Sequence, residues 1–144
     1  RDASTDVGKF QELQKFTYQN ALRNWQAAGG TGTDAQMEAA SHANPNDTLF
    51  PKALQDIAKW SKASELALQA KANAQDQWLQ SVGGDVSKQH EFENIWRQNF
   101  DPRVYQMKLM DQNELQKFTA KIPIQERQGL LSKYRFAKQQ GLVQ

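Results

Sequence analysis

Residues 50–82 read FPKALQDIAKWSKASELALQAKANAQDQWLQSV, with no glycine and a single proline at position 51. A proline is tolerated in the first helical turn because its missing N–H has no partner to bond there. Thr48 is placed to cap such a helix, and Gly83 and Gly84 supply a stop signal. The stretch therefore predicts one long helix of about nine turns.

One face of this predicted helix consists mostly of alanine, with a tryptophan toward each end. The residues of this helix-packing seam follow one another at spacings of three or four: Trp60, Ala63, Ala67, Ala70, Ala74 and Trp78. Residues so spaced share one side of a helix, and small side chains let a second helix approach closely. We expect the seam to contact another helix, from the same chain or from a second copy.

The composition limits the class of protein. A chain of 144 residues is long enough for one domain with its own core, and without cysteine it can form neither disulfides nor thiolate metal sites. The mean hydropathy of -0.84 is low, but four tryptophans, seven phenylalanines and a net charge of only +2 argue against disorder. No apolar run approaches the roughly 18 residues of a membrane span. Abundant alanine and glutamine favour helix over sheet.

A first helix is expected at about residues 7–28, capped by Thr5 or Asp6 and ended by Gly29 and Gly30. Its apolar face is expected to follow helical spacing: Phe10, Leu13, Phe16 or Thr17, Ala21, Trp25 and Ala28.

Short elements connect this helix to the long one. The loop GGTGT at 29–33 lacks the Gly-Lys-Ser/Thr of a phosphate-binding loop and is interpreted as a connector. Thr33 can cap a short helix at 34–43, and Asn-Pro-Asn-Asp at 44–47 predicts a turn.

Further helices are expected after residue 84. Their expected caps and breaks are Asp85 or Ser87, Asp101-Pro102, Asp111 with Glu114 as a capping box, Ile122-Pro123 and Gly141. The first of these helices is expected to carry an apolar stripe of Phe92, Ile95, Trp96 and Phe100, and a short helix is expected to run through Val104, Met107 and Leu109. In the last helix the residues expected to face inward are Leu130, Leu131, Tyr134 and Ala137. The sequence thus predicts an all-α bundle of five to seven helices organised around the long helix at about 50–82.

We expect this bundle to form a single domain over 1–144. It comprises an N-terminal part, 1–84, and a second part, 85–144, with an aromatic-rich helix and a basic C-terminal helical hairpin. The start at Arg1, without a methionine, is compatible with a fragment of a longer chain.

Charge differs between the two parts. The net charge is -1 over residues 1–84 and +3 over residues 85–144. The favoured explanation of the positive charge after residue 84 is that cations near helix C-termini interact favourably with the backbone dipole. The alternative is an anionic partner, with DNA contacted non-specifically. The possible phosphate contacts are Lys117, Lys121, Lys133, Arg135 and Lys138.

No catalytic, cofactor-binding or metal-binding site is predicted, so the chain is not expected to be an enzyme. His90 and Glu91 resemble the start of a helical zinc-protease motif, but Asn94 stands where a second histidine is required. The tail at 141–144, Gly-Leu-Val-Gln, is similar to a box of lysozyme-like transglycosylases, whose catalytic Glu-Ser pair is missing here. A peptidoglycan-cleaving domain is therefore the least favoured alternative.

A resemblance covers residues 92–142. The sequence from 92 reads FENIWRQNFDPRVYQM, and the pattern continues with Glu114, Phe118, Ile122-Pro123, Glu126-Arg127, Leu130-Leu131, Tyr134, Ala137 and Gly141-Leu142. This pattern resembles helical structural proteins of tailed bacteriophages, in which an aromatic-rich helix meets Asp-Pro-Arg and a helical hairpin ending in Gly-Leu follows. The resemblance implies a virion protein, assembled in the host cytoplasm, that acts by assembly with copies of itself and other virion proteins. Some similar proteins are carried inside the head and ejected with DNA.

The most specific part of the resemblance is Asp101-Pro102-Arg103-Val104-Tyr105, which belongs to a predicted helix junction. Its residues are Trp96, Phe100, Asp101, Pro102, Arg103 and Tyr105. An aspartate at a helix start accepts backbone N–H bonds, proline fixes the entry angle, and the aromatic rings clamp the corner. We expect the junction to set the angle between the aromatic-rich helix and the hairpin. The sequence itself identifies no partner for Arg103.

Overall fold

The computed structural model describes residues 3–32 and 35–143, and within them it confirms the predicted all-α class. The described residues form helices and connecting turns, and no strand occurs among them. The helices are α1 (Ala3–Ala27), α2 (Ala35–Ser41), α3 (Phe50–Ser81), α4 (Gln89–Asn99), α5 (Arg103–Lys108), α6 (Gln112–Lys121) and α7 (Ile124–Gln139), with a short 3-10 helix, η1 (Val86–Lys88), before α4.

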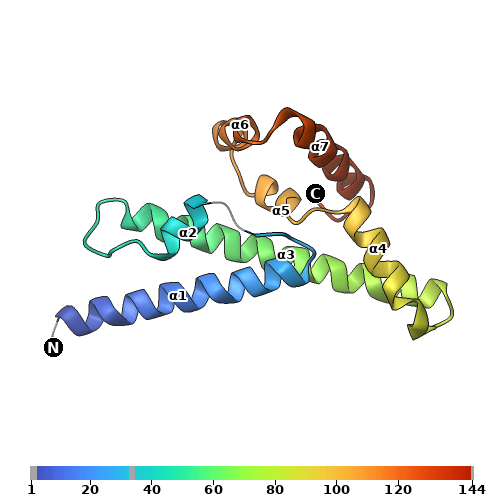
Figure 1. Cartoon of the computed structure of the whole chain (residues 1–144), viewed down its shortest axis with the longest axis horizontal. Coiled ribbons are helices and arrows are strands. Elements are labelled where there is room, and N and C mark those ends of the chain that lie inside the picture. The colour runs from blue at the N-terminus through green and yellow to red at the C-terminus, as the bar shows by residue number, and fades with distance from the viewer. Residues whose placement is uncertain (1–2, 33–34, 144) are drawn as a thin grey trace.

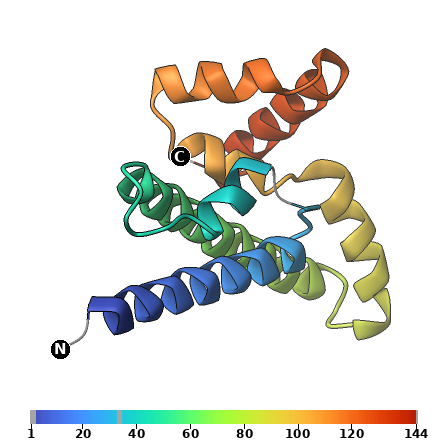
Figure 2. The same cartoon turned by 60° about the vertical axis from the view of Figure 1, so that its left-hand side comes forward.

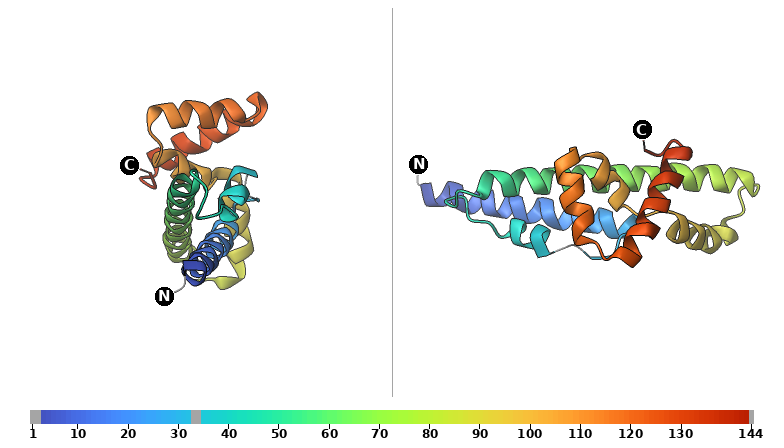
Figure 3. Two further views of the ribbon diagram at one scale, coloured as in Figure 1. Left: turned by 90° about the vertical axis from the view of Figure 1, so that its left-hand side faces the viewer. Right: turned by 90° about the horizontal axis from the view of Figure 1, so that it is seen from above.

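The bundle has two layers: α1 and α3 form one, and α5, α6 and α7 form the other (Figure 1). α1 lies beside α3 and runs in the same direction, which gives the molecule its long axis (Figure 3). α4 returns along the far end of α3, and α5, α6 and α7 form a layer on the side of α3 opposite to α1 (Figure 2). The other helices are therefore all arranged around α3.

The predicted central role of the long helix is visible in the core. The residues that the structure describes form three clusters of buried hydrophobic side chains, and α3 contributes to all of them: Ala53 and Ile57 to one, Trp60 to the second, and the alanines of the seam to the third. The third cluster combines α3 with residues from α4, α5 and α7. Residues before and after position 84 therefore share one core.

The C-terminal end of α3 was predicted correctly, but the residue at its N-terminal cap was not. Gly83 and Gly84 adopt positive φ angles of 71° and 78°, and the Gly84 N–H bonds the Leu79 carbonyl at 2.7 Å, as a glycine stop requires. At the start, the cap position is Leu49 instead of Thr48. The Asp47 carboxylate accepts the Leu49 N–H at 3.0 Å, so an Asx turn takes the place of the predicted threonine cap.

The first helix begins earlier than predicted, at Ala3, so that Thr5 and Asp6 lie within the helix. No glycine or proline separates residues 3–6, so nothing in the sequence stops the helix from extending toward the N-terminus. Its end after Ala27 agrees with the predicted stop: the Gly30 N–H bonds the Trp25 carbonyl at 2.9 Å.

The predicted inward face of α1 is correct only in its second half. Ala21, Trp25 and Ala28 are buried as predicted, and Ile57 of α3 is likewise buried. Three large apolar residues of the first half are exposed instead, by 53% at Phe10, 59% at Leu13 and 65% at Phe16. Packing of Ala21 and Trp25 fixes the rotation of the whole helix, which turns Gln14 toward Ala40 and these three residues toward solvent.

The connection between α1 and α3 largely follows the prediction. The turn at 44–47 is closed by the Asn46 N–H, which bonds the Asn44 side-chain oxygen at 3.0 Å. α2 covers Ala35–Ser41, within the expected range of 34–43. The proposed cap Thr33 lies outside the described residues.

The C-terminal helices begin and end close to the predicted signals. Asp85 caps η1, and Asp111 caps α6 by accepting the Glu114 N–H at 2.8 Å. Ile122 and Pro123 separate α6 from α7, which run in opposite directions (Figure 2). Ile95 was expected to face inward but is 42% exposed, because α4 turns Phe92 and Trp96 toward α3.

Candidate functional site

The predicted junction residues lie together at the corner between α4 and α5. Five aromatic rings follow one another through this corner, with centroid separations of 5.9 Å from Trp78 to Phe92, 6.0 Å from Phe92 to Trp96, 4.2 Å from Trp96 to Phe100 and 6.0 Å from Phe100 to Tyr105. Pairs at these separations stabilise a core beyond the area they bury. The corner is therefore a packed joint and not a surface turn.

Trp96 attaches the joint to the C-terminal end of α1. The indole N–H of Trp96 donates to the Ala28 carbonyl at 2.8 Å, and the Lys71 ammonium donates to the neighbouring Ala27 carbonyl at 2.9 Å. Lys71 also pairs with Glu93 of α4 at 2.9 Å. Carbonyls at the C-terminal end of a helix have no partner within the helix, so these contacts satisfy the end of α1 and bind it to α3 and α4.

Arg103 has two carboxylate partners that the sequence did not identify. Its guanidinium bonds Asp101 through Nε at 3.0 Å and through Nη2 at 2.7 Å, and it pairs with Glu126 of α7 through Nη1 at 2.8 Å. The Asp101 carboxylate also accepts the Arg103 backbone N–H at 2.9 Å, although Pro102 occupies the assigned cap position of α5. Burial alone would lower the pKa of Arg103, but the bonds and charges of the two carboxylates raise it overall. Arg103 thus connects the corner to α7.

Tyr105 completes the joint at its other end. Its ring is buried, and its hydroxyl donates to the Leu142 carbonyl just after α7. Burial raises the pKa of the Tyr105 hydroxyl, because the phenolate loses hydration in the core. The C-terminal turn is thereby fixed to α5.

Tyr105 predicts a loss of stability in alkali. A folded-state pKa above the unfolded value of about 10 means that its contribution is complete below that pH and is lost as pH rises through the folded pKa. Thermal midpoints measured between pH 8 and about 11.5 should fall less steeply in Tyr105→Phe than in the unmodified chain. Equal slopes would show that Tyr105 ionises as freely in the folded state as in the unfolded one.

The seam of α3 lies where a packing role requires. Trp60, Ala63, Ala67 and Ala70 are buried, while Ala74 and Trp78 are half-buried at the edge of the third cluster. Trp60 faces α1, with ring separations of 5.3 Å to Tyr18 and 6.0 Å to Trp25.

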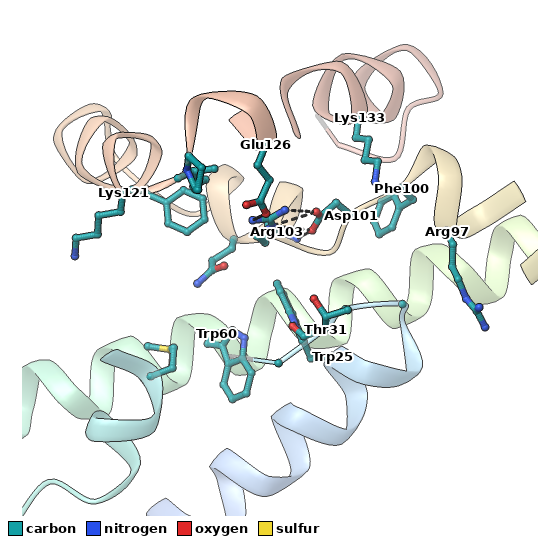
Figure 4. A pocket seen from close by; sticks show the side chains of 18 residues that line it. Trp25, Thr31, Trp60, Arg97, Phe100, Asp101, Arg103, Lys121, Glu126 and Lys133 are labelled. Atoms are coloured by element: carbon teal, nitrogen blue, oxygen red, sulfur yellow. Dashed lines mark hydrogen bonds and ion pairs between the residues drawn. The ribbon is translucent and has the colours of Figure 1, made fainter. Parts of the chain in front are cut away.

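A cleft of about 860 Å³ opens between the two layers (Figure 4). Trp25, Trp60 and the glycine loop at 29–32 line its lower side, and α5, α6 and α7 line its upper side. The loop closes tightly on Trp25: a Cβ added at Gly30 would clash with the indole ring. This loop, which was predicted to be a connector, therefore also forms a wall of the cleft.

The structure separates the five predicted phosphate contacts into groups. Lys121 and Lys133 line this cleft, and Lys117 lines a smaller hollow beside it. Arg135 and Lys138 do not line either hollow, and Lys138 lies 5.8 Å from the centre of the Tyr134 ring. Arg97 of α4 lines the cleft as well. Sequence reasoning missed Arg97 because it lies 24 positions before Lys121 and only the fold brings the two to one cleft.

No metal or membrane site emerges from the described part of the chain. His42 and His90 are exposed on separate elements, and the described residues hold no group of three or more metal-binding side chains. None of the described helices combines the length and apolar character of a membrane-spanning segment.

Comparison of the chain with models of protein families, with curated proteins and with solved structures finds no match.

Proposed function

We propose that this chain is a structural component of a tailed-bacteriophage particle, acting by assembly and not by catalysis. The observation that carries the proposal is the exposed apolar face of α1, formed by Phe10, Leu13 and Phe16. The three side chains follow one another at spacings of three along α1, and exposed apolar residues that form one patch mark an interaction site. The resemblance of residues 92–142 to helical virion proteins supports the particle as its place of assembly.

A second copy of the chain is the partner we assign to this face. Residues 6–16 carry no net charge, because Asp6 and Glu12 balance Lys9 and Lys15, so two copies do not repel one another here. Burying the exposed parts of the three apolar side chains contributes roughly 3–5 kcal/mol per copy. Pairing of two α1 helices therefore fits a protein present in several copies.

Sedimentation of a charge variant tests this proposal. At about 100 μM the unmodified chain should sediment as a dimer or larger species, whereas Leu13→Arg should be monomeric, since a charge in the buried face is costly. Val86→Arg is the matched control, because it places the same charge on an apolar residue that is exposed elsewhere. A monomeric unmodified chain, or equal effects of both variants, would contradict pairing through α1.

The particle itself provides the second test. Mass spectrometry of purified phage particles produced by cells that express the intact gene product should detect this chain at a fixed ratio to the major capsid protein. Absence from purified particles, with the protein present in the lysate, would overturn a structural role in the virion.

A further inference from the structure

We propose that the cleft between the two layers binds a single strand of nucleic acid through its phosphates. The cations concerned are Arg97, Lys121 and Lys133, from three different helices. This inference goes beyond assembly through α1, and it stands or falls separately, because self-association is measured without nucleic acid.

The charge of the cleft is the first step. Its two acidic residues, Asp101 and Glu126, are both engaged by Arg103. Arg97, Lys121 and Lys133 form no ion pair with any acid among the described residues, and Lys121 has only a long bond of 3.4 Å to Gln36. The cations that remain available therefore outnumber the available anions, and the cleft favours an anionic ligand.

The placement of these cations indicates an extended ligand. Figure 4 shows Lys121 at one end of the cleft and Arg97 at the other, with Lys133 between them and directed toward Phe100. Cations from three helices at different points along the cleft can contact successive phosphates of one strand. The volume of about 860 Å³ lies in the range of small-ligand sites and admits one strand rather than a duplex.

The remaining walls suit the bases of such a strand. Phe118 lines the cleft and is half-buried, so part of its ring remains available for a base to stack against. The backbone of Thr31 and Gly32 forms an exposed edge without bulky side chains, along which a sugar-phosphate chain can run closely. Stacking and phosphate contacts of this kind read no sequence, so the binding is expected to be non-specific.

Binding of a labelled dT12 oligonucleotide, measured by fluorescence polarisation, tests the site. Three phosphate contacts on a single strand predict a slope of about -2 in a plot of log affinity against log salt. The variant Lys121→Glu with Lys133→Glu should reduce the slope to about -0.7 and weaken binding at 50 mM salt roughly 50-fold or more. Arg97→Gln, at an exposed position, should weaken it less, in proportion to one lost contact.

The matched control changes the net charge of the chain by the same amount, but at residues outside the cleft. Arg135→Glu with Lys138→Glu alters the net charge equally and uses α7 residues that do not line the cleft, so it should retain a slope close to that of the unmodified chain. Equal losses in the two double variants would overturn the cleft as the site. A poly-glutamate of matched charge that binds as tightly as dT12 would overturn nucleic acid as the ligand, as would no binding of dT12 at 50 mM salt.

Discussion

Replacing Ala67 by arginine should prevent the chain from folding at room temperature. Ala67 is fully buried in the cluster that joins α3 to α4, α5 and α7. An arginine there has no space for its side chain and no partner for its charge, and both defects are costly. The two defects together should cost roughly 4–8 kcal/mol, which is comparable to the roughly 5–15 kcal/mol by which a native domain is stable.

Ala72→Arg provides the matched control for this prediction. It introduces the same side chain into the same helix, but at an exposed position. Urea unfolding followed by circular dichroism should give a midpoint close to that of the unmodified chain for Ala72→Arg and no cooperative transition for Ala67→Arg. Similar midpoints for the two variants would mean that the seam tolerates a charge and does not form the centre of the fold.

The sequence was informative wherever a signal is local. The glycines after α3, the capping aspartate of α6, the proline before α7 and Gly141 after it each act on backbone within a few residues, so the elements they bound could be predicted. The alanine seam was visible for the same reason: helical spacing alone places its members on one face.

What the sequence could not provide was the rotation and pairing of those helices. Phe10, Leu13 and Phe16 have the same spacing as buried residues, and only the packing of Trp25 against Trp60 decides which side of α1 faces inward. The pairing of Arg103 with Glu126 spans 23 positions and depends on how α7 returns to the corner. The cleft likewise exists only after two layers are stacked, so its cations could be named as basic residues but not as neighbours.

Removing the ring of Phe100 should have the next largest effect, because that ring lies at the centre of the joint between α4 and α5. It is buried, stacks on Trp96 at 4.2 Å and lies 6.0 Å from Tyr105. Truncation to alanine leaves a cavity between these rings, with an expected loss of about 3–5 kcal/mol. Asn99→Ala, one position earlier and exposed, is the matched control and should cost less than about 1 kcal/mol.

Combining Phe100→Ala with Asp101→Ala then tests whether Asp101 is coupled to the ring packing of the joint or acts only as an ordinary helix cap. Asp101 holds the guanidinium of Arg103 through two nitrogens, so its removal leaves that half-buried charge with Glu126 alone and should cost about 1.5–3 kcal/mol. In a joint that forms as a unit, chemical unfolding of the single and double variants should show a coupling energy of at least about 0.5 kcal/mol between the two sites. An ordinary cap would instead give a cost near 1 kcal/mol at Asp101 that simply adds to that of Phe100. The additive result would confine Asp101 to the start of α5, and the coupled one would mean that the angle between the aromatic helix and α7 is held by ring stacking and the Arg103 pairs together.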